Sequence, residues 1–271
     1  MKDMTPSTYL KGGALVAALT VVISVIMLIP DWNGFQGSAE RVQIDKLLDV
    51  MIVLSSLVFS VVVVMMGYAI WKYRAKPGDE SDGEPIHGNT RLEITWTVIP
   101  TIIVIFGAIY SWIVLDDIEA AEADAMPVKV TAQQFAWRFD YPEMGVTSTE
   151  LHAPAGRQLE LEMNALDVLH SFWVPEWGIK RDLVPGSDLP GATEIDNIAR
   201  VTPTVEGSYS VLCSEYCGIG HAGMRAPAVV VESQEEFEAW AETQNPIPEG
   251  PPRGAGYSGG FGAGSLAEGE E

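Results

Sequence analysis

Three apolar stretches dominate the first 115 residues of the chain. Residues 12–30 carry no charged side chain, residues 51–71 are uncharged over 21 positions, and residues 94–115 are uncharged over 22 positions. A helix needs roughly 20 apolar residues to cross ~30 Å of hydrocarbon. The second and third stretches therefore predict a transmembrane helical hairpin within residues 40–118, in preference to two buried helices of a soluble protein.

The first apolar stretch has two interpretations. Lys2 and Lys11 precede it, and small residues follow it at Gly37, Ser38 and Ala39. Residues 1–39 are therefore either a cleaved signal peptide or an additional transmembrane helix.

The orientation in the membrane follows from the loop between the second and third stretches. Lys72, Arg74, Lys76 and Arg91 flank this loop, and basic residues mark the cytoplasmic side of a membrane. The residues after position 115 are therefore expected outside, on the periplasmic or extracellular face.

Residues 119–243 show the pattern of an all-β domain. Residues 129–135, 158–163 and 208–212 alternate between apolar and polar side chains, and residues 225–231 are apolar and rich in β-formers. Pro and Gly pairs separate these runs, which is typical of a sandwich or barrel. Residues 235–243 predict a short helix, and the acidic, Gly- and Pro-rich residues 244–271 predict a disordered tail.

Charge is distributed unevenly along the chain. Residues 1–115 hold 10 acidic and 8 basic side chains, whereas residues 116–271 hold 27 acidic and 8 basic ones, a net charge of −19. Such a domain repels phosphate backbones, so nucleic-acid binding is not expected. It attracts a basic partner, unless the acidic surface serves only solubility or adaptation to high salt.

One short segment concentrates the residues with metal chemistry. Cys213, Cys217, His221 and Met224 lie within twelve residues, and His170 ends a predicted strand upstream. Thiolate, thioether and imidazole ligands together select copper, zinc or an iron–sulfur cluster.

Three interpretations of these donors compete. A disulfide between the two cysteines leaves His221 and Met224 without a role. Zinc accepts two Cys and two His but does not use the thioether. Two bridging thiolates, one histidine for each ion and weak axial ligands suit a dinuclear copper centre, which we favour.

The motif Cys213-x-Glu215-x-Cys217-x-x-x-His221-x-x-Met224, with Asp167-Val-x-His170-Ser upstream, resembles the copper A site of subunit II of haem–copper cytochrome c oxidases. The resemblance covers about residues 40–235. It implies a membrane-anchored, cupredoxin-like Greek-key β-sandwich after the helical hairpin. It also implies a Mg²⁺ ion, shared with subunit I, at the side chain of Glu215. The implied copper ligands are His170, Cys213, the main-chain carbonyl of Glu215, Cys217, His221 and Met224.

Two further segments resemble this family. The segment from His87 to Pro100 is similar to the start of the second family helix, which places Glu93 at the mouth of a proton path in subunit I. A solvated carboxylate at the membrane edge is the alternative. The segment from Gln133 to Tyr141 is similar to the aromatic patch that receives electrons, with Phe135 at the position where tryptophan is usual and Trp137 two residues later.

The resemblance implies an electron-transfer subunit of a prokaryotic, multi-pass membrane oxidoreductase that does not reduce oxygen by itself. Cytochrome c or a small copper protein would donate electrons to copper, which would pass them to the haems of subunit I for oxygen reduction coupled to proton translocation. Subunit I, other oxidase subunits and membrane lipid are the expected partners. A nitric oxide reductase subunit and a membrane-anchored copper-delivery protein are the alternative functions.

Overall fold

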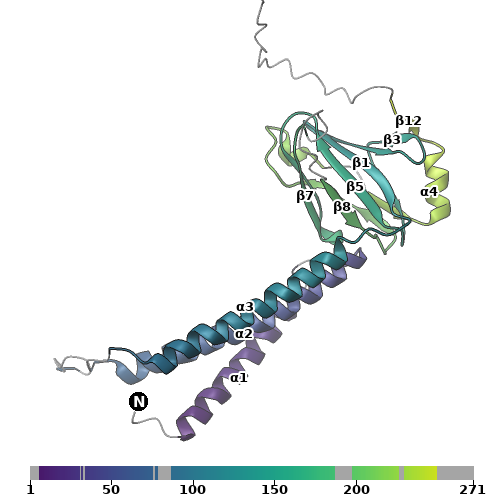
Figure 1. Cartoon of the computed structure of the whole chain (residues 1–271). Coiled ribbons are helices and arrows are strands. Elements are labelled where there is room, and N and C mark those ends of the chain that lie inside the picture. Colours follow the sequence, from purple (N-terminus) through teal and green to yellow (C-terminus); the bar gives the residue numbers. More distant parts are fainter. Residues whose placement is uncertain are drawn as a thin grey trace, which may run out of the picture. The chain divides into compact units, whose positions relative to one another are not determined.

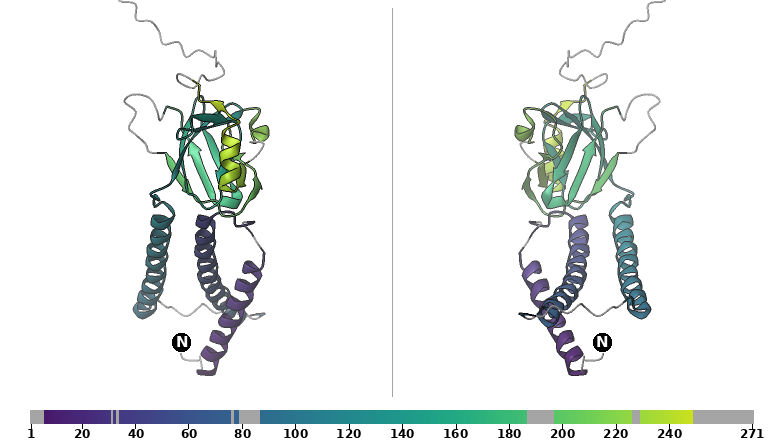
Figure 2. Two further views of the ribbon diagram at one scale, coloured as in Figure 1. Left: turned by 90° about the vertical axis from the view of Figure 1, so that its right-hand side faces the viewer. Right: turned by 90° about the vertical axis from the view of Figure 1, so that its left-hand side faces the viewer.

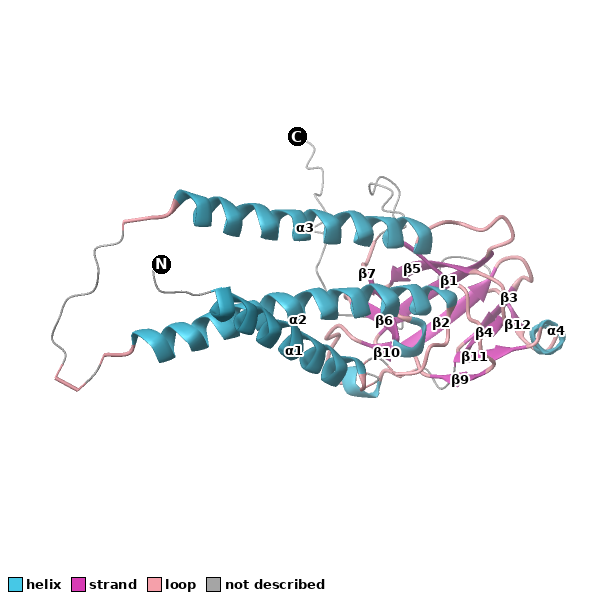
Figure 3. Cartoon of the chain, turned by 90° about the horizontal axis from the view of Figure 1, so that it is seen from below, coloured by secondary structure: helices cyan, strands magenta, loops and turns pink. Residues whose placement is uncertain are grey.

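The computed structural model describes residues 6–30, 32, 34–75, 77–78, 87–186, 197–225 and 229–248. Helices form the first part of the chain and strands the second (Figures 1 and 3). The chain divides into two compact units, one of residues 1–35 and 42–118, the other of residues 36–41 and 119–271. Three apolar helices followed by a β-sandwich confirm the predicted architecture.

The three apolar stretches are all helical. They form α1, Pro6–Leu28, α2, Ala39–Tyr73, and α3, Thr90–Ile118, and each is long and apolar enough to cross a membrane. Most large apolar side chains of these helices are exposed, which suits a lipid or protein environment rather than water. The chain is therefore a membrane-anchored protein.

The strands of the second unit form a six-stranded and two three-stranded sheets, in the orders β12-β3-β2-β1-β5-β8, β10-β6-β7 and β4-β11-β9. Most neighbouring strands are antiparallel, and the β1–β5 and β4–β11 pairs are parallel. The bounds are β1 Met126–Gln133, β2 Ala136–Tyr141, β3 Val146–Ser148, β4 Leu151–Pro154, β5 Leu159–Ala165, β6 His170–Val174, β7 Ile179–Leu183, β8 Ile198–Val201, β9 Gly207–Tyr209, β10 Leu212–Cys213, β11 Val229–Glu232 and β12 Asn245–Pro246.

Alternation along the strands builds the core of the sandwich. In β5, Leu159, Leu161 and Met163 are buried, whereas Glu162 between them is exposed. The inner faces meet around fully buried aromatic residues such as Phe139 and Phe172, whose rings lie edge to face. This core fixes the strands whose ends carry His170 and Cys213, two of the predicted ligands.

Two predicted strands differ from the observed ones for physical reasons, and positions 226–228 of a third, predicted at residues 225–231, lie outside the described residues. The run at residues 208–212 divides into β9 and β10, because β9 pairs with β11 while β10 pairs with β6 of another sheet. The run at residues 129–135 ends as a strand at Gln133, because Gln134 turns out of the ladder to bond elsewhere.

Helix α4, Gln234–Ala241, follows the last long strand, close to its predicted position. Ser233 and Glu236 form a reciprocal capping box at its start, which satisfies otherwise unpaired N–H groups. Phe237 and Trp240 of α4 pack their rings on Tyr141 of β2. Figure 2 shows this helix, in yellow-green, lying against the strands of the sandwich.

Residues 244–271, predicted as a disordered tail, lie outside the described residues from position 249. Within the described part, Asn245–Pro246 pair with β3 as β12.

The segment Gln36–Arg41 belongs to the sandwich unit. Its Ser38 is fully buried, donates its hydroxyl to the Trp177 carbonyl and accepts the N–H of Arg41 as the N-cap of α2. Backbone bonds join Gly37 to the Glu176 carbonyl and Ala39 to the Thr202 carbonyl. Residues 37–39 would end the segment that is either a cleaved signal peptide or a further helix. In the intact chain they hydrogen-bond to the sandwich.

Candidate metal centre

Two neighbouring strands bring the distant metal-binding residues together. His170 begins β6 and Cys213 ends β10, and these strands are antiparallel partners with Cys213 opposite Phe172. The loop after β10 folds back onto this strand, and the N–H of Cys213 donates to the carbonyl of Met224 at 3.2 Å. His170, which lies 43 positions before Cys213 in the sequence, is thus brought beside the loop that carries the remaining donors.

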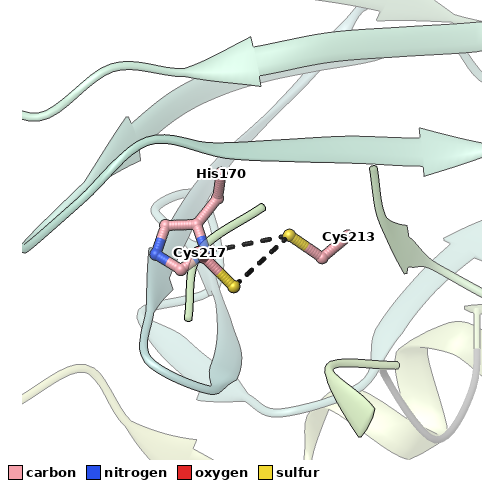
Figure 4. A group of neighbouring side chains, drawn as sticks. All are labelled: His170, Cys213 and Cys217. Atoms are coloured by element: carbon pink, nitrogen blue, oxygen red, sulfur yellow. Dashed lines mark hydrogen bonds between the residues drawn. The ribbon is translucent and has the colours of Figure 1, made fainter. Parts of the chain in front are cut away.

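Figure 4 shows three of the donor residues, His170, Cys213 and Cys217, with their donor atoms facing one another. The sulfurs of Cys213 and Cys217 lie 3.9 Å apart. Nδ1 of His170 lies 3.8 Å from the sulfur of Cys213, and Nδ1 of His221 lies 3.6 Å from that of Cys217. Each thiol therefore has its own imidazole.

Two weaker donors, a carbonyl oxygen and a thioether sulfur, lie beside the two thiols. The carbonyl oxygen of Glu215 lies 3.3 Å from the Cys213 sulfur, and the thioether sulfur of Met224 lies 3.7 Å from the Cys217 sulfur. Met224 is almost fully buried. The six predicted ligand residues thus meet at one end of the sandwich.

This geometry bears on the three interpretations of the donors, which are a disulfide, a zinc site and a copper pair. Both cysteines are free thiols, and 3.9 Å between their sulfurs is far beyond a disulfide bond of ~2.05 Å. It is less than twice a metal–sulfur bond of ~2.3 Å, so one ion can bond both sulfurs. Among the described residues, His170, Cys213 and Cys217 form a group within 4.8 Å that does not include His221. The donors thus form two sets, one around each sulfur.

The orientation of His170 is set by Asp167. Nε2 of the buried imidazole lies 2.8 Å from Oδ1 of Asp167. An ionised carboxylate only accepts hydrogen bonds, so Nε2 carries the proton and Nδ1 presents its lone pair to the thiols. Desolvation raises the pKa of Asp167, but hydrogen bonds from His170, Gln134 and Val168 outweigh it and hold the pKa below its usual value.

The Cys217 thiol is protonated in the metal-free protein at neutral pH. Burial, with a further contribution from the neighbouring Cys213, raises the pKa of the Cys217 thiol to about 11. Since a metal binds the thiolate, metal uptake displaces this proton. Burial thus keeps water away from the Cys217 sulfur, whereas Cys213 and His221 are partly exposed.

Phe135 and Trp137, two candidates for receiving electrons, occupy different positions. Trp137 is only 4% exposed, and its ring lies edge-on to those of His170 and Phe172. Phe135 is 37% exposed, and its ring covers the backbone of the ligand loop so closely that a Cβ on Gly220 would lie 2.5 Å from it. Phe135 therefore reaches both solvent and the ligand loop.

Glu93 closes the first turn of α3. Its Oε1 accepts the N–H of Asn89 at 3.1 Å, and Oδ1 of Asn89 accepts the N–H of Leu92. This reciprocal pair satisfies N–H groups at the helix start. This structural role was not predicted from the sequence, although Asn-x-x-x-Glu before an apolar run is its signal.

Asp167 was part of the recognised motif, but no role was predicted for it. The three-residue spacing from His170 is the only signal in the sequence of their contact, and the loop geometry that closes it is visible only in the structure.

The fold and the site together define a membrane-anchored protein with a cupredoxin-like metal-binding domain. Residues 32–114 match the family model of the cytochrome c oxidase subunit II transmembrane domain, and residues 146–233 match that of the periplasmic domain. The chain belongs to the cytochrome c oxidase subunit II family and is thus a subunit of a haem–copper oxidoreductase complex.

Individual relatives agree with this assignment. Cytochrome c oxidase subunit 2 of Synechocystis sp. is 31% identical, over 88% of this chain and 84% of the relative. Its counterpart from Alkalihalophilus pseudofirmus is 37% identical, over 71% of this chain and 55% of the relative. The solved periplasmic domain of subunit II from Bradyrhizobium japonicum is 25% identical, covers 46% of this chain and 96% of that domain, and gives a TM-score of 0.41.

Proposed function

We propose that this chain is the electron-accepting subunit of an oxygen-reducing cytochrome c oxidase, with a dinuclear copper centre held by His170, Cys213, Glu215, Cys217, His221 and Met224. The observation that carries the proposal is the pair of thiols 3.9 Å apart, each faced by its own imidazole nitrogen. A bound copper pair would supply a one-electron carrier. The residues of the chain hold the donors in place for both oxidation states.

The surroundings of the site favour a docked donor protein. Exposed apolar side chains border the ligands in sequence: Leu169 precedes His170, and Tyr216 and Ile219 flank Cys217. Phe135 adds an exposed ring packed on the same loop. An apolar contact surface within a domain of net charge −19 suits a basic cytochrome c or a small copper protein.

Electrons enter through Phe135 rather than Trp137. Phe135 is exposed and touches the ligand loop, whereas Trp137 packs within the core behind His170. The aromatic ring gives the donor a short contact with the backbone between Cys217 and His221.

Rapid mixing of reduced cytochrome c with the assembled oxidase tests this proposal. Phe135→Ala should slow donor oxidation several-fold, and Phe135→Trp should retain the wild-type rate. Trp137→Phe, which keeps an aromatic core side chain, serves as the matched control and should also retain it. A large loss in Trp137→Phe with none in Phe135→Ala would place electron acceptance at Trp137.

Two further assignments complete the proposal. The side chain of Glu215, whose carbonyl faces Cys213, binds Mg²⁺ together with subunit I. Glu93 delivers protons to subunit I from the start of α3, in addition to capping that helix. With the basic loop inside, the copper domain lies on the periplasmic or extracellular side of a prokaryotic cell membrane.

A further inference from the structure

A two-residue connection between β1 and β2 bonds to both metal-binding segments. Gln133 of β1 pairs with Ala136 of β2, so Gln134 and Phe135 form the whole turn. The backbone N–H of Gln134 donates to Oδ2 of Asp167 at 2.7 Å, and its side-chain Nε2 donates to the carbonyl of Cys217 at 2.5 Å. These partners are 33 and 83 positions away in the sequence.

Both contacts lead directly to metal ligands. The carboxylate of Asp167 accepts Gln134 on one oxygen and Nε2 of His170 on the other. The carbonyl of Cys217 belongs to a ligand residue itself. The side chain of Asp167 therefore links Gln134 to His170. Gln134 also contacts Cys217 of the loop directly.

We propose that Gln134 is a positioning residue that fixes the separation between the His170 segment and the Cys217 loop. This inference rests on the proposed function, because it concerns the donors of the copper pair. Groups around a metal site that orient its ligands affect metal affinity and reactivity strongly. A fixed separation keeps each imidazole beside its own thiol.

Close packing between this turn and the ligand loop also helps to hold the two segments together. A Cβ on Gly218 would lie 2.9 Å from Nε2 of Gln134, and a Cβ on Gly220 would lie 2.5 Å from the ring of Phe135. Gly218 also has a φ of +136°, which L side chains rarely adopt. The ligand loop is thus held by one hydrogen bond and one ring, and the glycines allow the close approach.

Replacement of Gln134 by methionine tests the hydrogen bond separately from the volume. Gln134→Met keeps the length of the side chain and removes its donor. In the full chain loaded with copper, we expect copper to be lost to a chelator about ten- to a hundred-fold more readily. We also expect a changed copper hyperfine pattern in the paramagnetic resonance spectrum and a shifted reduction potential.

Gln234→Ala is the matched control, because Gln234 bonds only Glu238 on exposed α4 in the hydrogen bonds described. Thermal unfolding of the metal-free variants separates lost folding from lost positioning. A folded Gln134→Met protein with wild-type affinity, spectrum and potential would overturn the inference. If the wild-type spectrum showed a single copper ion, the proposed function would fail, and the affinity comparison would still decide the role of Gln134.

Discussion

At the scale of single residues, the site depends on which atom each ligand presents. Asp167 fixes the proton of His170 on Nε2, so that Nδ1 faces Cys213. The types and spacing of the side chains pointed to five candidate ligands, because thiols, imidazoles and a thioether at such intervals have few other uses. The resemblance to subunit II added the carbonyl of Glu215. Neither predicted the bond from Gln134 to Cys217, because a polar side chain in a turn carries no local signal of a partner 83 residues away.

Met224 tests the difference between holding copper and tuning it. Its buried sulfur lies 3.7 Å from that of Cys217, and a weak thioether ligand mainly sets the reduction potential. Met224→Leu should therefore retain copper and shift the potential, at a stability cost below about 1.5 kcal/mol. Copper analysis and redox titration provide the measurement.

Met163→Leu, a buried methionine of β5, controls for the loss of a core thioether and should leave the potential unchanged. Complete loss of copper from Met224→Leu alone would show that Met224 is a structural ligand.

At the scale of elements, hydrophobic pattern predicted the helices well and the strands less well. Long uncharged runs determine α2 and α3 almost by themselves, since few other structures accommodate them. Strand ends depend on partners from other parts of the chain. The run at residues 208–212 shows this, because β9 and β10 join different sheets and the alternation alone cannot reveal the change.

The start of α3 gives a prediction about the two roles of Glu93. Glu93→Gln retains an oxygen that can accept the Asn89 N–H but removes the exchangeable proton. If Glu93 feeds a proton path, oxygen consumption by the whole complex should fall several-fold in Glu93→Gln, while copper content and spectrum remain native.

Glu93→Ala removes both the proton and the capping contact, and thus shows the added effect of an uncapped helix start. Wild-type turnover of Glu93→Gln between pH 6 and 9 would leave capping as the sole function of this carboxylate.

At the scale of the whole molecule, charge and apolarity are divided between the parts of the chain. The membrane-spanning part is nearly neutral, and residues 116–271 carry a net charge of −19. The sequence predicts this division completely, because it follows from composition. What the sequence leaves open is where a donor docks, since this depends on which side chains surround the ligand loop.

Electrostatic steering gives a prediction at this scale. Opposite charges attract over about one Debye length, which falls from ~10 Å at 0.1 M salt to ~3 Å at 1 M. The second-order rate of oxidation of a basic cytochrome c should therefore fall steeply between these salt concentrations. A small neutral reductant provides the control and should show a nearly flat profile. A flat or rising profile with cytochrome c would mean that the acidic surface does not steer the donor.

If Cys213 and Cys217 hold two copper ions between them, the copper-loaded full chain should contain two coppers per protein. Its paramagnetic resonance spectrum should show a hyperfine pattern from one electron shared equally by two nuclei. Cys217→Ser, which removes one of the two thiols, should lose that pattern. A single bound ion, or a wild-type spectrum from one copper nucleus, would mean that the two thiols do not hold a copper pair.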